Sequence, residues 1–190
     1  MRRRVFIAIN LPQEIKEKIF NFQKKWPTLP CRWVPKENLH LTLAFLGYLN
    51  DEELKKVCEA TKEVAVKSKP FSIFLNRVCY GPPKMMPPRL VWVKGNKTEE
   101  LSKLKEELDK LLSEKINFLP EKREFTPHVT IGRIKRWNWR RIEPEERPDV
   151  NLKISLEIPV NSIEVMESHL KRSGAEYIVL KSFRLSNLNL

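Results

Sequence analysis

Two histidines of this chain stand in the same local pattern, and that pattern has the residue types needed to move protons. His40 is followed by one apolar residue and then by Thr42, and His128 is followed in the same way by Thr130. Histidine titrates close to neutral pH, so one imidazole can be neutral while another is protonated. Two imidazoles on opposite sides of a reacting group can therefore act as general base and general acid.

The two threonines suggest that the reacting group is a phosphodiester. Hydroxyl groups can donate hydrogen bonds to non-bridging phosphate oxygens, and Arg133, just after the second pattern, can bind the same oxygens bidentately. Neither pattern contains the Asp or Glu cluster that a magnesium site requires, so we expect no metal and no cofactor. The chemistry suits the opening of a strained 2′,3′-cyclic phosphate. From the residues alone, either histidine can be the acid or the base.

This chemistry requires both patterns to lie on β-strands. Side chains two residues apart share one face of a strand, whereas the same spacing on a helix puts them on nearly opposite sides. His40 and Thr42 then share one face, and the leucines between and after them turn toward a core. His128 and Thr130 do the same, with a valine and an isoleucine behind them.

The elements that precede the two histidine strands also repeat. A strand and then a helix are predicted before His40, and another strand and helix are predicted before His128. This repeated order indicates an internal duplication with pseudo-two-fold symmetry, and we expect residues 1–190 to form one domain of two lobes. The predicted helices are 13–25, 51–68 after a cap at Asn50, and 99–115 after a cap at Thr98; the other predicted strands are 4–9, 32–34, 70–80, 89–94, 152–158, 162–168 and 175–186.

The charge of the chain favours a polyanionic partner. There are 36 Lys and Arg residues against 24 Asp and Glu residues, a formal net charge of +12. An excess of this size favours nucleic acid or an anionic membrane surface. We expect no membrane partner, because no basic amphipathic helix stands out and no segment has the apolar length of a membrane span.

The cysteines and the N-terminus indicate a cytoplasmic protein. Cys31, Cys58 and Cys79 are odd in number and scattered, which argues against a disulfide framework and a zinc site and for free thiols. The apolar run at residues 5–9 is too short for a secretory signal. Nothing in the sequence suggests more than a monomer.

The segment 133–147 is basic and contains Trp137 and Trp139. Two interpretations are equally open: the tryptophans stack on single-stranded RNA, or they cover a sheet edge while the charges are solvated. His169 is expected to be a solvated strand residue, and Trp33 is expected to be a core residue in preference to lining the cleft for a base.

Taken together, these motifs resemble the RNA 2′,3′-cyclic phosphodiesterases, also called 2′-5′ RNA ligases, of the two-histidine phosphoesterase superfamily. The resemblance implies an α+β fold of two similar lobes, each an antiparallel sheet backed by helices, which face each other across a central cleft. The segments that carry it are 3–9, 32–34, 37–43, 88–92, 126–133 and 168–170, with Gly174 and Tyr177.

The resemblance also implies roles for the residues of the doubled pattern. It implies metal-independent hydrolysis of RNA 2′,3′-cyclic phosphate ends to 2′-phosphomonoesters, with His40 as proton donor and His128 as proton acceptor. Thr42, Thr130 and Arg133 would bind the phosphate. The substrate, whether a tRNA fragment, an oligonucleotide or a nucleotide, stays open. So do two alternatives: the reverse reaction, which is 2′-5′ ligation of tRNA halves, and a non-catalytic module that binds RNA ends.

Overall fold

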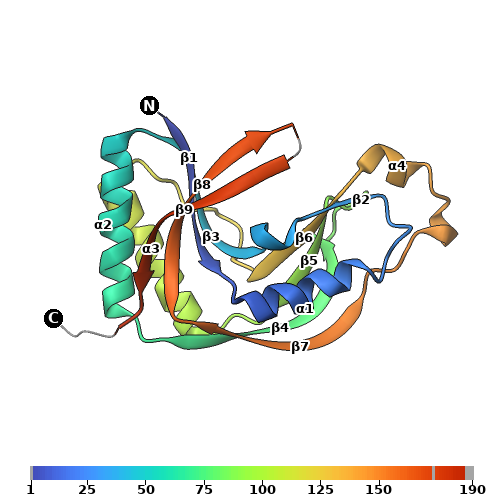
Figure 1. Cartoon of the computed structure of the whole chain (residues 1–190), viewed down its shortest axis with the longest axis horizontal. Coiled ribbons are helices and arrows are strands. Elements are labelled where there is room, and N and C mark those ends of the chain that lie inside the picture. Colours follow the sequence, from blue (N-terminus) through green and yellow to red (C-terminus); the bar gives the residue numbers. More distant parts are fainter. Residues whose placement is uncertain (1, 173, 187–190) are drawn as a thin grey trace.

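The computed structural model describes residues 2–172 and 174–186 (Figure 1). Strands and helices alternate through the first two thirds of the chain, except that β5 follows β4 directly, and three strands follow at its end. The strands are β1 Arg3–Asn10, β2 Cys31–Trp33, β3 His40–Leu49, β4 Phe71–Gly81, β5 Leu90–Gly95, β6 His128–Ile134, β7 Leu152–Val160, β8 Ser162–Lys171 and β9 Gly174–Arg184. The helices are α1 Gln13–Gln23, α2 Asp51–Lys67, α3 Glu99–Lys115 and α4 Arg136–Arg140, with 3₁₀ turns η1 Lys36–Asn38 and η2 Pro144–Glu146.

The strands form two antiparallel halves that meet in the middle of the molecule. One half has the order β3-β1-β8-β9, and the other has the order β6-β5-β4-β7, with β2 added on β6. Each histidine strand is thus the inner strand of its half and pairs with the strand that precedes it in the duplicated order. The α+β fold of two similar lobes is confirmed, and the two halves are also joined, because Leu41 of β3 pairs with Val129 of β6.

The helices form where the sequence supplies caps and one apolar face. Asn50 and Glu53 make a capping box at the start of α2, and the Thr98 side chain accepts from the backbone N–H of Leu101 at the start of α3. Helix α1 ends at Gln23, two residues before the predicted end. The backbone N–H of Lys25 bonds to the carbonyl three residues earlier, so the last turn tightens ahead of Pro27.

Each helix of the duplicated unit packs on elements of the opposite half. Helix α1 follows β1 but contacts β6 and lies along β7, while α3 packs on α2, which contacts β8 and β9 (Figure 1). One continuous cluster of buried apolar side chains includes strands from both halves. This shared core supports the prediction of a single domain, which remains a prediction.

The two tryptophans of the 133–147 segment differ in their environments. Trp139 is 2% exposed and packs edge-on against Tyr80, with ring centroids 5.2 Å apart, so it covers the sheet. Trp137 is 73% exposed. Trp33 is half-buried against the core.

Candidate active site

The two histidine patterns lie side by side at the junction of the halves. His40 opens β3 and His128 opens β6, and the residues directly after them, Leu41 and Val129, pair with each other. Leu41 and Val129 are 0% exposed, so alternation turns both histidines and both threonines to the opposite face. The seam between β3 and β6 in Figure 1 therefore brings two imidazoles and two hydroxyls together.

A β-bulge in each histidine strand changes which residues reach this face. In β6, Thr130 pairs with Trp92 and Gly132 with Val91, so Ile131 is an extra residue. Strict alternation would have turned Arg133 toward the core side. The extra residue shifts the alternation by one, and Arg133 is exposed on the face that carries Thr130.

The same bulge occurs in β3, where it exposes an aromatic residue. Thr42 pairs with Ala8 and Ala44 with Ile7, so Leu43 is the extra residue, and Phe45 turns outward with 70% exposure. Phe45 thus occupies in the first half the position that Arg133 occupies in the second, five residues after the histidine. The sequence interpretation missed Phe45; the signal that could have found it is this equal spacing.

Both imidazoles are oriented in the same way. His40 Nδ1 lies 2.7 Å from the carbonyl oxygen of Asn38, and His128 Nδ1 lies 2.7 Å from that of Thr126. A carbonyl can only accept a hydrogen bond, so Nδ1 carries the proton and Nε2 is free for proton exchange. In the neutral His40 ring, Nε2 accepts from the hydroxyl of Thr42, 3.0 Å away. No sequence signal pointed to these carbonyl partners.

Aromatic side chains hold each imidazole in place. The His40 ring contacts Phe6 and Tyr177, with centroids 4.9 Å and 5.1 Å away, and these two rings also contact each other at 5.0 Å. The His128 ring is stacked on Trp92 at 3.8 Å. Trp92 in turn lies over Gly81, where a Cβ atom would come within 2.2 Å of the indole. Glycine at position 81 therefore allows Trp92 to reach His128.

Burial favours the neutral form of both histidines before substrate binds. It lowers the pKa of His40 to about 4; the hydrogen bond to Asn38 opposes this shift, and the positive charges of Lys16, His128 and Arg133 add to it.

Burial also lowers the pKa of His128, and the hydrogen bond to the Thr126 carbonyl opposes that shift. With both pKa values lowered, the free protein holds two neutral imidazoles at pH 7.

The lowered pKa of His40 predicts a loss of stability in acid. An unfolded histidine titrates near 6.5, so below that pH the unfolded chain takes up a proton that folded His40 takes up only near pH 4. The stabilising effect is complete above pH 6.5 and is lost as the pH falls toward 4, to a total of about 3 kcal/mol. Chemical denaturation of His40→Asn should show a smaller fall in the free energy of unfolding between pH 7 and 4.

Asparagine can keep the hydrogen bond to the Asn38 carbonyl without titrating, and His169→Asn, which removes an exposed histidine, is the control. Equal pH dependence in the wild type and in His40→Asn would contradict the burial argument.

One cavity contains most of the predicted site. It has a volume of about 320 Å³, and four of the five predicted residues line it: His40, Thr42, Thr130 and Arg133. His128 is the fifth; it does not line the cavity and lies two residues before Thr130 on the same strand face. Residues that the sequence interpretation left out complete the lining: Arg4, Val5, Phe6, Val34, Asn38, Phe45, Gly47, Ser168 and Tyr177.

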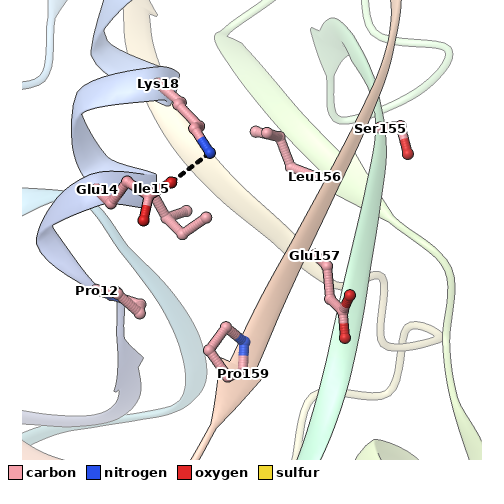
Figure 2. Close-up of a pocket in the computed structure, with 8 residues that line it drawn as sticks. All are labelled: Pro12, Glu14, Ile15, Lys18, Ser155, Leu156, Glu157 and Pro159. Atoms are coloured by element: carbon pink, nitrogen blue, oxygen red, sulfur yellow. Dashed lines mark hydrogen bonds and ion pairs between the residues drawn. The ribbon is translucent and has the colours of Figure 1, made fainter.

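A second hollow, of about 440 Å³, lies between α1 and β7 and is larger (Figure 2). Two of its lining residues form an exposed ion pair, in which Lys18 Nζ lies 2.5 Å from the Glu14 carboxylate. The described residues that line this hollow include no histidine or cysteine. Despite its size, it has no histidine of the doubled pattern, so the smaller cavity is the better candidate for the site.

The other predicted groups lie outside the cavity. His169 is exposed and lies 3.4 Å from the Glu167 carboxylate. All three cysteines are free, and burial raises the pKa of the Cys31 thiol to about 12, which keeps it protonated. Within residues 2–172 and 174–186, no group of three His, Cys, Asp or Glu side chains could hold a metal ion. In the same residues, no helix is both long and apolar enough to span a membrane.

Known protein families match this chain in both halves. The family model described as "LigT like Phosphoesterase" matches residues 9–92, which contain His40, and again residues 93–177, which contain His128. The RNA 2′,3′-cyclic phosphodiesterase of Methanocaldococcus jannaschii is 32% identical over 186 residues, covering 95% of this chain and 99% of the relative. The protein of the same name from Thermotoga maritima is 32% identical over 182 residues, covering 93% and 92%.

Solved structures show the same fold. The crystal structure of TT0787 of Thermus thermophilus is similar with a TM-score of 0.83 at 29% identity, covering 98% of this chain and 100% of that one. The crystal structure of E. coli LigT complexed with 3′-AMP is similar with a TM-score of 0.76 at 26% identity, covering 97% and 99%. The likeness therefore extends over both lobes.

Proposed function

This chain belongs to the LigT-like phosphoesterases, and we propose that it hydrolyses RNA ends carrying a 2′,3′-cyclic phosphate to 2′-phosphomonoesters without a metal ion. The observation that carries the proposal is the convergence of two oriented imidazoles, two hydroxyls and Arg133 at one seam. The names of the relatives point to the same substrate class.

In the proposed reaction, the two imidazoles exchange protons through Nε2. Water attacks phosphorus as His128 Nε2 takes its proton, and the bond from phosphorus to O3′ breaks. His40 Nε2 gives its proton to O3′, and the phosphate remains on O2′. The choice of His40 as donor follows the family resemblance, because both rings are oriented alike by a backbone carbonyl.

The donor must be charged by the arrival of substrate. With both imidazoles neutral, the free protein is one proton short, since the reaction needs a protonated His40. The cyclic phosphate is an anion, and an anion close to an imidazole raises the pKa of that imidazole. We infer that substrate and proton bind together, and that His128 releases its proton to water before the next turnover.

Hydrogen-bond donors around the phosphate would stabilise the charge that develops on it. The Thr42 hydroxyl, which contacts His40 Nε2 in the free protein, would turn to a phosphate oxygen, and Thr130 would contribute the matching bond from β6. Arg133 would bind the non-bridging oxygens with its planar fork. These donors need no metal to complete them.

Incubation with 2′,3′-cyclic AMP in the presence of a chelator should give 2′-AMP as the sole product. The expected regiochemistry follows from protonation of O3′, and the expected resistance to chelation follows from a donor set made of imidazole, hydroxyl and guanidinium groups. Chromatography of the products against 2′-AMP and 3′-AMP standards measures both the regiochemistry and the activity that remains with the chelator.

A product dominated by 3′-AMP, or activity that returns only when a divalent metal is added back, would contradict the proposal. Binding without any turnover would favour the RNA-end-binding module. Formation of a 2′-5′ bond from RNA halves would identify the reverse reaction.

A further inference from the structure

The outward face of α4 carries an exposed aromatic side chain that the proposed reaction does not use. A helix turns about 100° per residue, so side chains two apart lie on nearly opposite sides. Trp139 is buried at 2% exposure against Tyr80, and Trp137 is therefore turned to solvent at 73% exposure. Trp139 anchors the short helix, and the anchor fixes the direction of Trp137.

Two arginines lie one helical turn after the exposed indole. Arg140 and Arg141 lie three and four residues after Trp137, which places them beside it at the helix end, and both are exposed. Neither forms an ion pair within 4.0 Å with a carboxylate of residues 2–172 or 174–186, although three glutamates follow them in the chain. An exposed aromatic ring with two guanidinium groups one helical turn away, neither held in an ion pair by the described residues, matches a base and its neighbouring phosphates.

This surface continues from the strand that carries the candidate site. β6 holds His128, Thr130 and Arg133, and α4 begins at Arg136, after a turn of one residue. Four residues of chain span at most about 14 Å, so Trp137 lies within that distance of Arg133, backbone to backbone. Stacked nucleotides of one strand are spaced about 3.4 Å apart, so a few nucleotides bridge this distance.

We propose that Trp137, Arg140 and Arg141 bind the single-stranded RNA upstream of the cyclic phosphate, which makes the substrate an oligonucleotide end rather than a free nucleotide. The expected effect on turnover rests on the proposed function, whereas the expected effect on RNA binding does not depend on it. A base stacks on Trp137, and the two arginines follow the backbone. Part of the excess positive charge of the chain would then contact the RNA backbone at α4.

The test measures binding and turnover separately. The binding probe is a fluorescein-labelled decanucleotide that ends in a 2′-phosphate and so is not turned over. Trp137→Ala should weaken its Kd by about 5- to 100-fold. Arg140→Ala/Arg141→Ala should lower the slope of log Kd against log salt by about 1.4, because two phosphate contacts are lost. Phe74→Ala and Arg184→Ala, an exposed aromatic and an exposed arginine on β4 and β9, should change neither value.

The turnover arm compares a cyclic-phosphate decanucleotide with 2′,3′-cyclic AMP. Trp137→Ala should lower kcat/KM for the decanucleotide by the same 5- to 100-fold and leave that for the mononucleotide unchanged. Equal losses of kcat/KM on both substrates in Trp137→Ala, or unchanged binding of the decanucleotide by that variant, would overturn the inference. The inference would also be overturned if these variants lost binding to phosphatidylserine vesicles while their RNA binding stayed intact. That result would assign this face of α4 to a membrane. Wild-type protein that turns over neither substrate would refute the proposed function, and the binding arm would still decide the role of α4.

Discussion

Replacing His40 or His128 by alanine is expected to lower kcat for 2′,3′-cyclic AMP by about 10²- to 10⁴-fold. Each imidazole is oriented by a backbone carbonyl so that Nδ1 carries the proton of the neutral ring, and Nε2 of each would handle one of the two protons of the same displacement. Since one step needs both transfers, the double variant should be little slower than the slower single variant. Steady-state kinetics on the three proteins measures this directly.

The fold should survive these changes. Both side chains are only partly buried and lie on the face opposite the core, and the residues that pack the seam, Leu41 and Val129, are untouched. Circular dichroism and the free energy of unfolding at pH 7 check this, and His169→Ala provides a matched loss of an exposed imidazole. A single variant that is folded and retains the wild-type rate would rule out the two-histidine mechanism.

The local parts of this site could be predicted from the sequence because they depend on short-range periodicity. A spacing of two between His40 and Thr42, with leucine between them, makes sense only on a strand, and the structure has a strand there. The caps at Asn50 and Thr98 set helix starts through side-chain bonds within one turn, and both helices begin where predicted.

The long-range parts could not be predicted in the same way. No local pattern says that Leu41 pairs with Val129, or that each crossover helix lies on the opposite half, because both depend on how the two lobes dock. The bulges at Leu43 and Ile131 were also hidden, since two adjacent buried residues read as ordinary apolar sequence. Each bulge turns the residue two positions later, Phe45 or Arg133, to the cavity face.

The bulges reveal an asymmetry within the duplication. At the same position of the two halves, one lobe turns Phe45 into the cavity and the other turns Arg133 into it. A duplicated site that held two arginines would bind a more highly charged group, and one with two aromatic rings would lack a partner for the phosphate. One of each suits a nucleotide, in which an aromatic base is joined to an anionic phosphate through the ribose.

Because Arg133 and Phe45 would bind different parts of the substrate, replacing each should lower kcat/KM by a different amount. Arg133→Ala should lower kcat/KM by about 10²- to 10³-fold, because a donor to the charged phosphate is lost in the transition state. Phe45→Ala should lower it by about 5- to 100-fold through KM, because a stacking surface for the base is lost. Arg133→Lys should restore only part of the rate, since an ammonium group keeps the charge and loses the fork.

A substrate without a base separates the two roles. For ribose 2′,3′-cyclic phosphate, the loss in Arg133→Ala should persist, whereas Phe45→Ala should match the wild type, because the ring then has nothing to stack on. Equal losses for Phe45→Ala on cyclic AMP and on the base-free substrate would show that Phe45 supports the fold of the cavity instead. A near-normal rate in Arg133→Ala would mean that another cation holds the phosphate. Arg4, which also lines the cavity, would be the candidate. The exchange of one guanidinium for one phenyl ring between two copies of the same strand would then no longer explain how a symmetric fold binds an asymmetric substrate.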